Sequence, residues 1–99
     1  MRRLTTPTHI FDVPFDTDII QKCRIVYAQN EHIILTKEEC ELSDQSIKVC
    51  LTQEETALFD CKKHYCEVQA HILTVDGKSL VSAPLRVAVE KCLDMGVLE

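Results

Sequence analysis

The chain has 99 residues, of which 45% are hydrophobic, and its 11 Lys and Arg against 16 Asp and Glu give a net charge of −5. That length predicts one domain. The negative charge is the wrong sign for a surface that gains affinity by neutralising phosphates, so a nucleic-acid partner is not expected. No apolar run approaches the roughly 20 residues of a membrane span or forms the apolar core of a signal peptide. We therefore expect no membrane partner and no secretion.

The chain contains six cysteines, and their chemistry depends on the compartment. In a secreted chain of this size they would predict a disulfide framework. In reducing cytosol, where we expect the protein to be kept, they should be free thiols.

Apolar residues recur with a period of two along most of the chain, which predicts strands that are buried on one face. The first strand spans about residues 8–13 and ends at Pro14, which has no N–H to donate to a neighbouring strand. In "KCRIVYAQ", Cys23, Ile25 and Tyr27 share one face. The short polar break "QNE" leads into "HIILTKE", and this order predicts an antiparallel hairpin.

The apolar pattern in the middle of the chain predicts two further strands. A short strand lies around residues 40–42, and a turn follows at residues 43–45. In the next strand Ile47, Val49 and Leu51 alternate with other residues and should face the core.

A helical turn is predicted near residues 53–59. Thr52 is followed three residues later by Glu55, the spacing at which a threonine caps a helix start and a glutamate returns the hydrogen bond. Leu58 and Phe59 would then fill the bottom of the core.

The segment at residues 64–75 alternates again, with a predicted core face made of Cys66, Val68, Ala70 and Ile72. The dipeptide Asp76-Gly77 is a strong hairpin signal, because a type I′ turn needs positive φ at both central residues. A last strand runs over about residues 79–89, and Pro84 interrupts it, which suggests an edge strand or a bulge.

Together these elements predict an all-β chain, an immunoglobulin-like antiparallel β-sandwich of six or seven short strands with one short helical turn. The domain would span residues 1–99, with residues 1–7 as a flexible arm and residues 91–99 as a short tail. Tyr65 shares a face with Glu67 on its strand, so a tyrosine buried at the sandwich corner is not expected.

The closest group of metal-ligating residues is Cys61, His64 and Cys66, which could supply three zinc ligands with Cys40 or Cys50 as a fourth. A zinc site usually combines two close pairs, and no second C-x2-C or H-x3-H pair exists. Free cysteines are among the most buried residue types. We therefore interpret the segment as a turn leading into a strand, and we expect no metal and no cofactor.

No catalytic constellation is recognisable in the sequence. A thioredoxin-like redox pair needs C-x2-C at a helix start, whereas the spacing here is C-x4-C after the predicted helix. The two glycines leave few places for a nucleophile elbow or a phosphate-binding loop. The acidic groups lack the pattern of a calcium loop. We expect that the protein is not an enzyme.

Two segments are candidate interaction surfaces. His32, Ile34 and Thr36 form one face of "HIILTKE", and the opposite face is also apolar, so either a partner or the centre of a sheet would cover this strand. The N-terminal "RRLTTPTHIF", which includes Leu4 and Ile10, could reach a neighbour and add a strand to its sheet.

A resemblance to known proteins is carried by three stretches, "TTPTHIFDVPFDTDIIQKCRIVYAQNEHIILTKE", "LTQEETALFDCKKHYCEVQAHILTVDGKSLVS" and "VEKCLDMGVL". Together they resemble a group of small prophage-encoded proteins of gut Firmicutes. That group is similar to the immunoglobulin-like N-terminal modules of phage baseplate and tail proteins. The resemblance implies a non-enzymatic structural or assembly protein. It would contact further copies of itself or phage structural proteins, in the host cytoplasm or within a virion.

Two alternatives remain open. The first is a small zinc-binding β-domain that uses the group around His64. The second is a host-directed protein inhibitor that blocks an enzyme by binding to it, which would share the acidic charge and the lack of a catalytic site.

Overall fold

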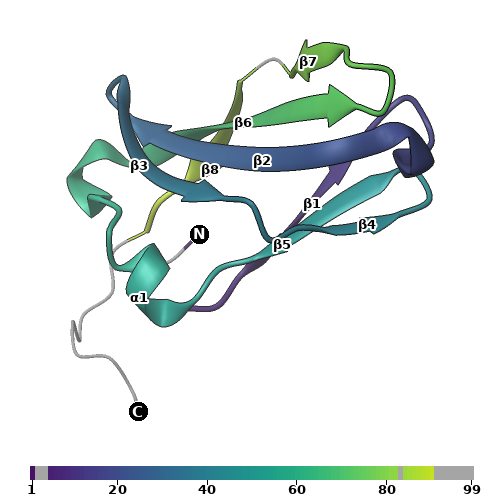
Figure 1. Cartoon of the computed structure of the whole chain (residues 1–99). Helices are drawn as coiled ribbons and strands as arrows, with labels where there is room; N and C mark the ends of the chain where they lie inside the picture. Colours follow the sequence, from purple (N-terminus) through teal and green to yellow (C-terminus); the bar gives the residue numbers. More distant parts are fainter. Residues whose placement is uncertain (2–4, 83, 91–99) are drawn as a thin grey trace.

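The computed structural model describes residue 1, residues 5–82 and residues 84–90, so the predicted tail at 91–99 and Leu4 lie outside the described residues. In chain order the elements are β1 (Thr8–Asp12), η1 (Thr17–Ile19), β2 (Ile20–Gln29), β3 (His32–Lys37), β4 (Glu41–Ser43), β5 (Ser46–Cys50), α1 (Gln53–Thr56), η2 (Cys61–Lys63), β6 (Tyr65–Thr74), β7 (Ser79–Val81) and β8 (Leu85–Ala88). The chain is mostly β, and its helical segments are single short turns (Figure 1).

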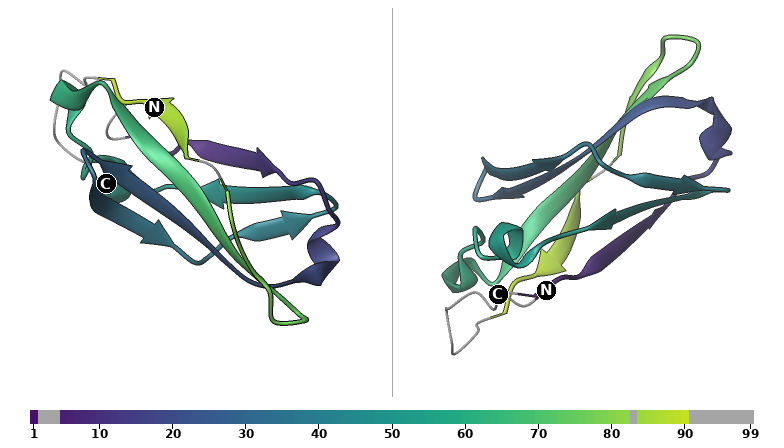
Figure 2. Two further views of the ribbon diagram at one scale, coloured as in Figure 1. Left: turned by 90° about the horizontal axis from the view of Figure 1, so that it is seen from above. Right: turned by 60° about the horizontal axis from the view of Figure 1, so that its bottom comes forward.

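The strands form two antiparallel sheets that face each other (Figure 2). One sheet has the strand order β1-β5-β4, and the other has the order β3-β2-β6 with β7 and β8 both paired to β6. With β1 in the place of immunoglobulin strand B, the first sheet holds strands B, E and D, and the second holds C′, C, F and G. The predicted immunoglobulin-like sandwich is therefore confirmed.

The first residues depart from the predicted flexible arm. Thr5 exchanges hydrogen bonds with the Thr56 hydroxyl at 3.1 and 2.9 Å, and the Pro7 carbonyl accepts from the Leu51 N–H at 3.0 Å. Ile10 is already inside β1, which pairs with β5. The described residues of this segment are therefore held against their own domain, because their backbone groups find partners there.

The predicted last strand is split in two, and both halves pair with the same edge of β6. The break is bridged by Ser82, whose N–H donates to the Ala70 carbonyl and whose hydroxyl accepts from the Ala70 N–H, both at 2.9 Å. Pro84 follows and has no N–H for the ladder. The interruption predicted at Pro84 is confirmed, and it brings the number of strands among the described residues to eight.

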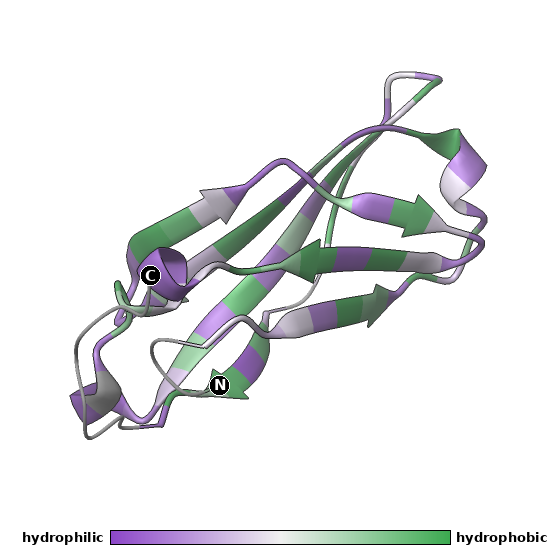
Figure 3. Ribbon diagram, turned by 90° about the horizontal axis from the view of Figure 1, so that it is seen from below, coloured by the Kyte–Doolittle hydropathy of each residue, from purple (hydrophilic) through white to green (hydrophobic). Residues whose placement is uncertain are grey.

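The core lies between the sheets, and Figure 3 shows how apolar and polar positions alternate along the strands that enclose it. All the β6 and β5 positions that were predicted to face the core are buried. The buried apolar side chains are Ile25, Tyr27, Ile47, Val49, Leu51, Phe59, Cys66, Val68, Ala70, Ile72 and Val89. Burying a large aliphatic or aromatic side chain contributes about 1.5–3 kcal/mol, so this set is the main source of stability.

The helical turn and the residues that follow it close one end of the core. Thr52 and Glu55 form the predicted capping box at the start of α1. Phe59 is buried and meets the Tyr27 ring edge-on, with ring centroids 5.7 Å apart. Leu58 is exposed, so the prediction that it also fills the core was wrong. Adjacent residues after a helix end point in different directions, and only one of them reaches the core.

The hairpin turns after β2 and after β6 differ in type. Asn30 and Glu31 have φ of 52° and 68°, as the two-residue loop between β2 and β3 requires. After β6 only Gly77 has positive φ, at 88°, so the type I′ turn predicted at Asp76-Gly77 was wrong. The Thr74 N–H instead donates to the Lys78 carbonyl at 2.9 Å, which closes a longer loop. The Thr74 hydroxyl contacts the Asp76 carboxylate and supports that loop.

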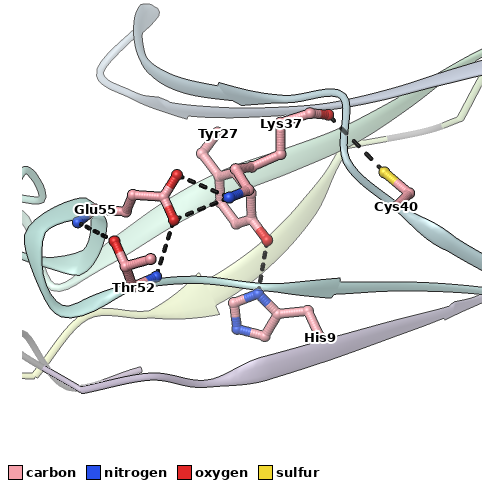
Figure 4. A network of polar contacts seen from close by, with 6 residues as sticks. All are labelled: His9, Tyr27, Lys37, Cys40, Thr52 and Glu55. Atoms are coloured by element: carbon pink, nitrogen blue, oxygen red, sulfur yellow. Dashed lines mark hydrogen bonds and ion pairs between the residues drawn. The ribbon is translucent and has the colours of Figure 1, made fainter.

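A polar contact crosses the core between the sheets (Figure 4). His9 Nδ1 on β1 and the Tyr27 hydroxyl on β2 are hydrogen-bonded at 2.7 Å. Burial raises the pKa of Tyr27, so the phenol stays protonated and keeps its hydrogen. Burial also lowers the pKa of His9, with a smaller contribution from the nearby amino terminus. The neutral imidazole is therefore the form that the folded chain prefers.

This preference predicts an acid-dependent loss of stability. The folded pKa of His9 lies below the ordinary value of 6.5, so the unfolded chain takes up a proton first as pH falls. The contribution of His9 is fully present above pH 6.5 and is lost as pH falls below it toward the folded pKa. Urea denaturation at several pH values should show a steeper decline for the unsubstituted chain than for His9→Gln, which cannot titrate. Parallel declines would contradict this role.

Candidate interaction surface

The side of the five-stranded sheet that points away from the core carries an apolar centre. Val26 and Ala28 alternate with core residues along β2, and both are half-buried. Ile33 on β3 lies directly opposite Ala28 and is 68% exposed. A shallow hollow of about 540 Å³ lies over these three residues and also borders Gln69 and Pro84.

Charged side chains of both signs surround this centre. Arg24 on β2, Glu31 in the β2–β3 turn and Glu67 on β6 border the same hollow. Arg86 on β8 pairs with Glu67 across the sheet, and its guanidinium carbon lies 4.5 Å from the centre of the Tyr65 ring. We call the apolar centre and this charged rim together the outer face.

The composition of the outer face depends on a β-bulge in β3. Tyr27 pairs with Leu35, and the next residue, Ala28, pairs with Ile33. Ile34 is therefore an extra residue on β3 with no partner on β2. A bulge of this kind reverses the side-chain alternation beyond it.

The bulge corrects the predicted face of β3. Strict alternation placed His32, Ile34 and Thr36 together, but Ile34 is half-buried and packs against the core. Ile33 takes its place on the exposed side with Thr36, while His32 is exposed at the hairpin end. The strand is thus apolar toward both sides, as predicted, although the exposed isoleucine is a different one.

β3 is held to the domain by an ion pair with the helical turn. Lys37 Nζ lies 3.0 and 2.9 Å from the two carboxylate oxygens of Glu55, and both side chains are largely buried (Figure 4). Burial alone would raise the pKa of Glu55, but hydrogen bonds from Lys37 and from the Thr52 N–H lower it below its ordinary value. The carboxylate therefore stays charged and fixes the end of β3.

The other predicted interaction residues lie elsewhere. Ile10 on β1 is 64% exposed and belongs to the second sheet, where it pairs with Lys48. Leu4 lies outside the described residues. The structure thus separates the predicted candidates onto two opposite sides of the sandwich.

The structure does not bring together the described residues of the predicted zinc group. Cys66 is buried in the core, and burial raises the pKa of its thiol to about 11. His64 is exposed in the preceding turn with φ of 63°. The side chain of Cys61 lies outside the described atoms. In the described part of the chain, no three potential ligands from His, Cys, Asp or Glu are close enough to hold a metal ion.

The structure brings together one pair of residues that no motif in the sequence marks. Cys23 on β2 and Cys40 before β4 are half-buried and line the same groove, and each thiol shifts the pKa of the other. The period-two pattern placed Cys23 on a core face, which is a correct but incomplete signal. The same pattern could not show that the crossover after β3 brings Cys40 back beside Cys23.

Comparison with protein-family models, curated proteins and solved structures found no match. Among residues 1, 5–82 and 84–90, no helix has the length and apolar character needed to cross a membrane.

Proposed function

We propose that the protein is a non-enzymatic interaction domain that associates with a second copy of itself through the outer face. By its resemblance to phage baseplate and tail modules, it would act as a phage structural or assembly component in the host cytoplasm and in the virion. The observation that carries the proposal is Ile33, a large apolar side chain that is 68% exposed above a half-buried apolar pair. Contiguous exposed apolar surface of this kind is typical of protein contacts.

The charges of the outer face favour a second copy as the occupant. Arg24 and Arg86 balance Glu31 and Glu67, so these four side chains sum to zero while the whole chain carries −5. The excess negative charge therefore lies elsewhere, and two copies can meet here without net repulsion. In a two-fold contact each copy presents the same patch, so arginines of one copy can face glutamates of the other.

Two matched substitutions test the proposal. Ile33→Asp places a carboxylate at the centre of the outer face, and Ile10→Asp makes the same change at a similarly exposed position on the other sheet. A buried interface anchor contributes about 2 kcal/mol or more, and a two-fold contact contains it twice. Ile33→Asp should therefore weaken the dimer at least about 100-fold in sedimentation velocity, since 1.4 kcal/mol is tenfold in affinity.

Ile10→Asp should leave the dimer unchanged. If Ile10→Asp abolishes association and Ile33→Asp does not, the contact lies on β1 and the outer face is not the site. Circular dichroism of both variants shows whether each chain is folded.

The phage assignment has a separate test. Particles released after prophage induction would be purified, and their proteins quantified by mass spectrometry. Recovery of the chain at a fixed ratio to a known tail protein supports a virion component. Presence in the cell lysate but not in the particles would contradict that part of the proposal.

A further inference from the structure

Two thiols from separate elements meet near the start of β2. Cys23 belongs to β2, and Cys40 belongs to the crossover that leads from β3 in one sheet to β4 in the other. Both side chains remain partly exposed, and each thiol shifts the pKa of the other. Cys40 Sγ also donates to the Lys37 carbonyl at 3.9 Å. A groove of about 670 Å³ is open beside them and is lined by both residues.

The surroundings make the two thiols unequal. The neighbouring Cys23 thiol lowers the pKa of Cys40, and the charge of Lys37 acts in the same direction, although burial opposes both. The Cys40 thiol, together with burial, raises the pKa of Cys23. Cys40 is therefore the thiol that ionises first, and the thiolate is the form that attacks a disulfide.

The groove also has a charge of its own. Lys22 and Arg24 line it, and Glu38 is the only carboxylate among its lining residues. This local positive excess stands out on a chain with a net charge of −5. It favours an oxidant that carries carboxylates, such as a small peptide disulfide.

We propose that Cys23 and Cys40 are a redox-sensitive modification site that forms a reversible disulfide by exchange with an anionic low-molecular-weight disulfide. The Cys40 thiolate attacks one sulfur of the small disulfide, forms a mixed disulfide and releases one thiolate. Cys23 then gives up its proton and attacks the Cys40 sulfur, which releases the second small thiol. The chain loses two electrons and two protons, and the small disulfide becomes two thiols. The proposal does not rest on the function proposed above.

The position of Cys40 allows the bond to close. Residues 38–40 lie between β3 and β4 and belong to neither strand, so they can move without breaking a strand ladder. A disulfide bond of about 2.05 Å needs a close approach of the two sulfur atoms. Once formed, it ties the crossover to β2 and restricts the unfolded chain, which should stabilise the fold.

The test uses the full chain, equilibrated in buffers that range from excess reduced to excess oxidised glutathione. Acid quenching and N-ethylmaleimide block the remaining thiols, and mass spectrometry of a digest shows which cysteines are linked. We expect peptides that join Cys23 to Cys40, and a melting temperature that is about 5–15 °C higher in the oxidised chain.

Three variants show whether the pair acts as described. In Cys23→Ser the second step is blocked, so a mixed disulfide with glutathione should accumulate on Cys40. In Cys40→Ser no linked peptide and no rise in melting temperature should appear. Cys50→Ser removes an exposed thiol on β5 and should behave as the unsubstituted chain does. If Cys50 is glutathionylated while Cys23 and Cys40 stay unlinked, or if either joins another cysteine instead, the proposal is overturned.

Discussion

Replacing Phe59 by alanine should lower the free energy of unfolding by about 3–5 kcal/mol. Phe59 is 1% exposed and closes the end of the core beside the Tyr27 ring, so its removal leaves a cavity between the sheets. A domain of this size has a total stability of about 5–15 kcal/mol, so the loss is a large part of it. Urea denaturation followed by circular dichroism measures the change.

The neighbouring residue provides the control for this experiment. Leu58 is 56% exposed, and its replacement by alanine should change the free energy of unfolding by less than about 1 kcal/mol. The two substitutions are adjacent in sequence and remove side chains of the same apolar class. Similar losses in both variants would show that Phe59 does not fill the core in the way described.

Replacing Gln29 by leucine should cost about 2–4 kcal/mol, because it removes two partly buried hydrogen bonds to the Asp60 backbone and leaves those groups without their partner. Gln29 is 2% exposed at the end of β2. Its side-chain amide donates to the Asp60 carbonyl at 2.9 Å, and its side-chain oxygen accepts from the Asp60 N–H at 2.8 Å. A weaker contact at 3.4 Å reaches the Tyr65 carbonyl. One side chain thus joins the β2–β3 hairpin to the turn before β6.

Gln69→Leu is the matched control. Gln69 lies on the solvent side of β6 and donates to the Ser82 carbonyl at 2.8 Å. Water can replace that contact, so the expected loss is below about 1 kcal/mol. A loss for Gln29→Leu no larger than for Gln69→Leu would contradict the structural role assigned to Gln29. Denaturant titration of both variants in the same buffer makes the comparison.

The sequence predicted those parts of the fold that depend on local patterns. Strict alternation in β6 identified its buried face. When every second residue is apolar, those residues must share the face that points to the core. The spacing of Thr52 and Glu55 identified the helix start, because a capping box needs only residues that are close in the chain. The exposed Tyr65 followed from the same alternation. The resulting fold class was correct.

The features that were missed depend on contacts between distant segments. The bulge in β3 exchanges Ile34 for Ile33 on the exposed side, and a chain that is apolar at both positions gives no local sign of it. The longer loop at Asp76 is set by its contacts with Thr74, which the dipeptide pattern does not include. The meeting of Cys23 and Cys40 requires the β3–β4 crossover, which only the tertiary structure defines.

Native mass spectrometry of the unsubstituted chain, purified in reductant without chelator and measured over a range of concentrations, is the most direct test of association through the outer face. One spectrum reports both the subunit count and any bound metal. We expect a metal-free homodimer that dissociates on dilution. A monomer at all concentrations would contradict association through Ile33, and a monomer with one bound zinc ion would favour the metal-binding alternative instead.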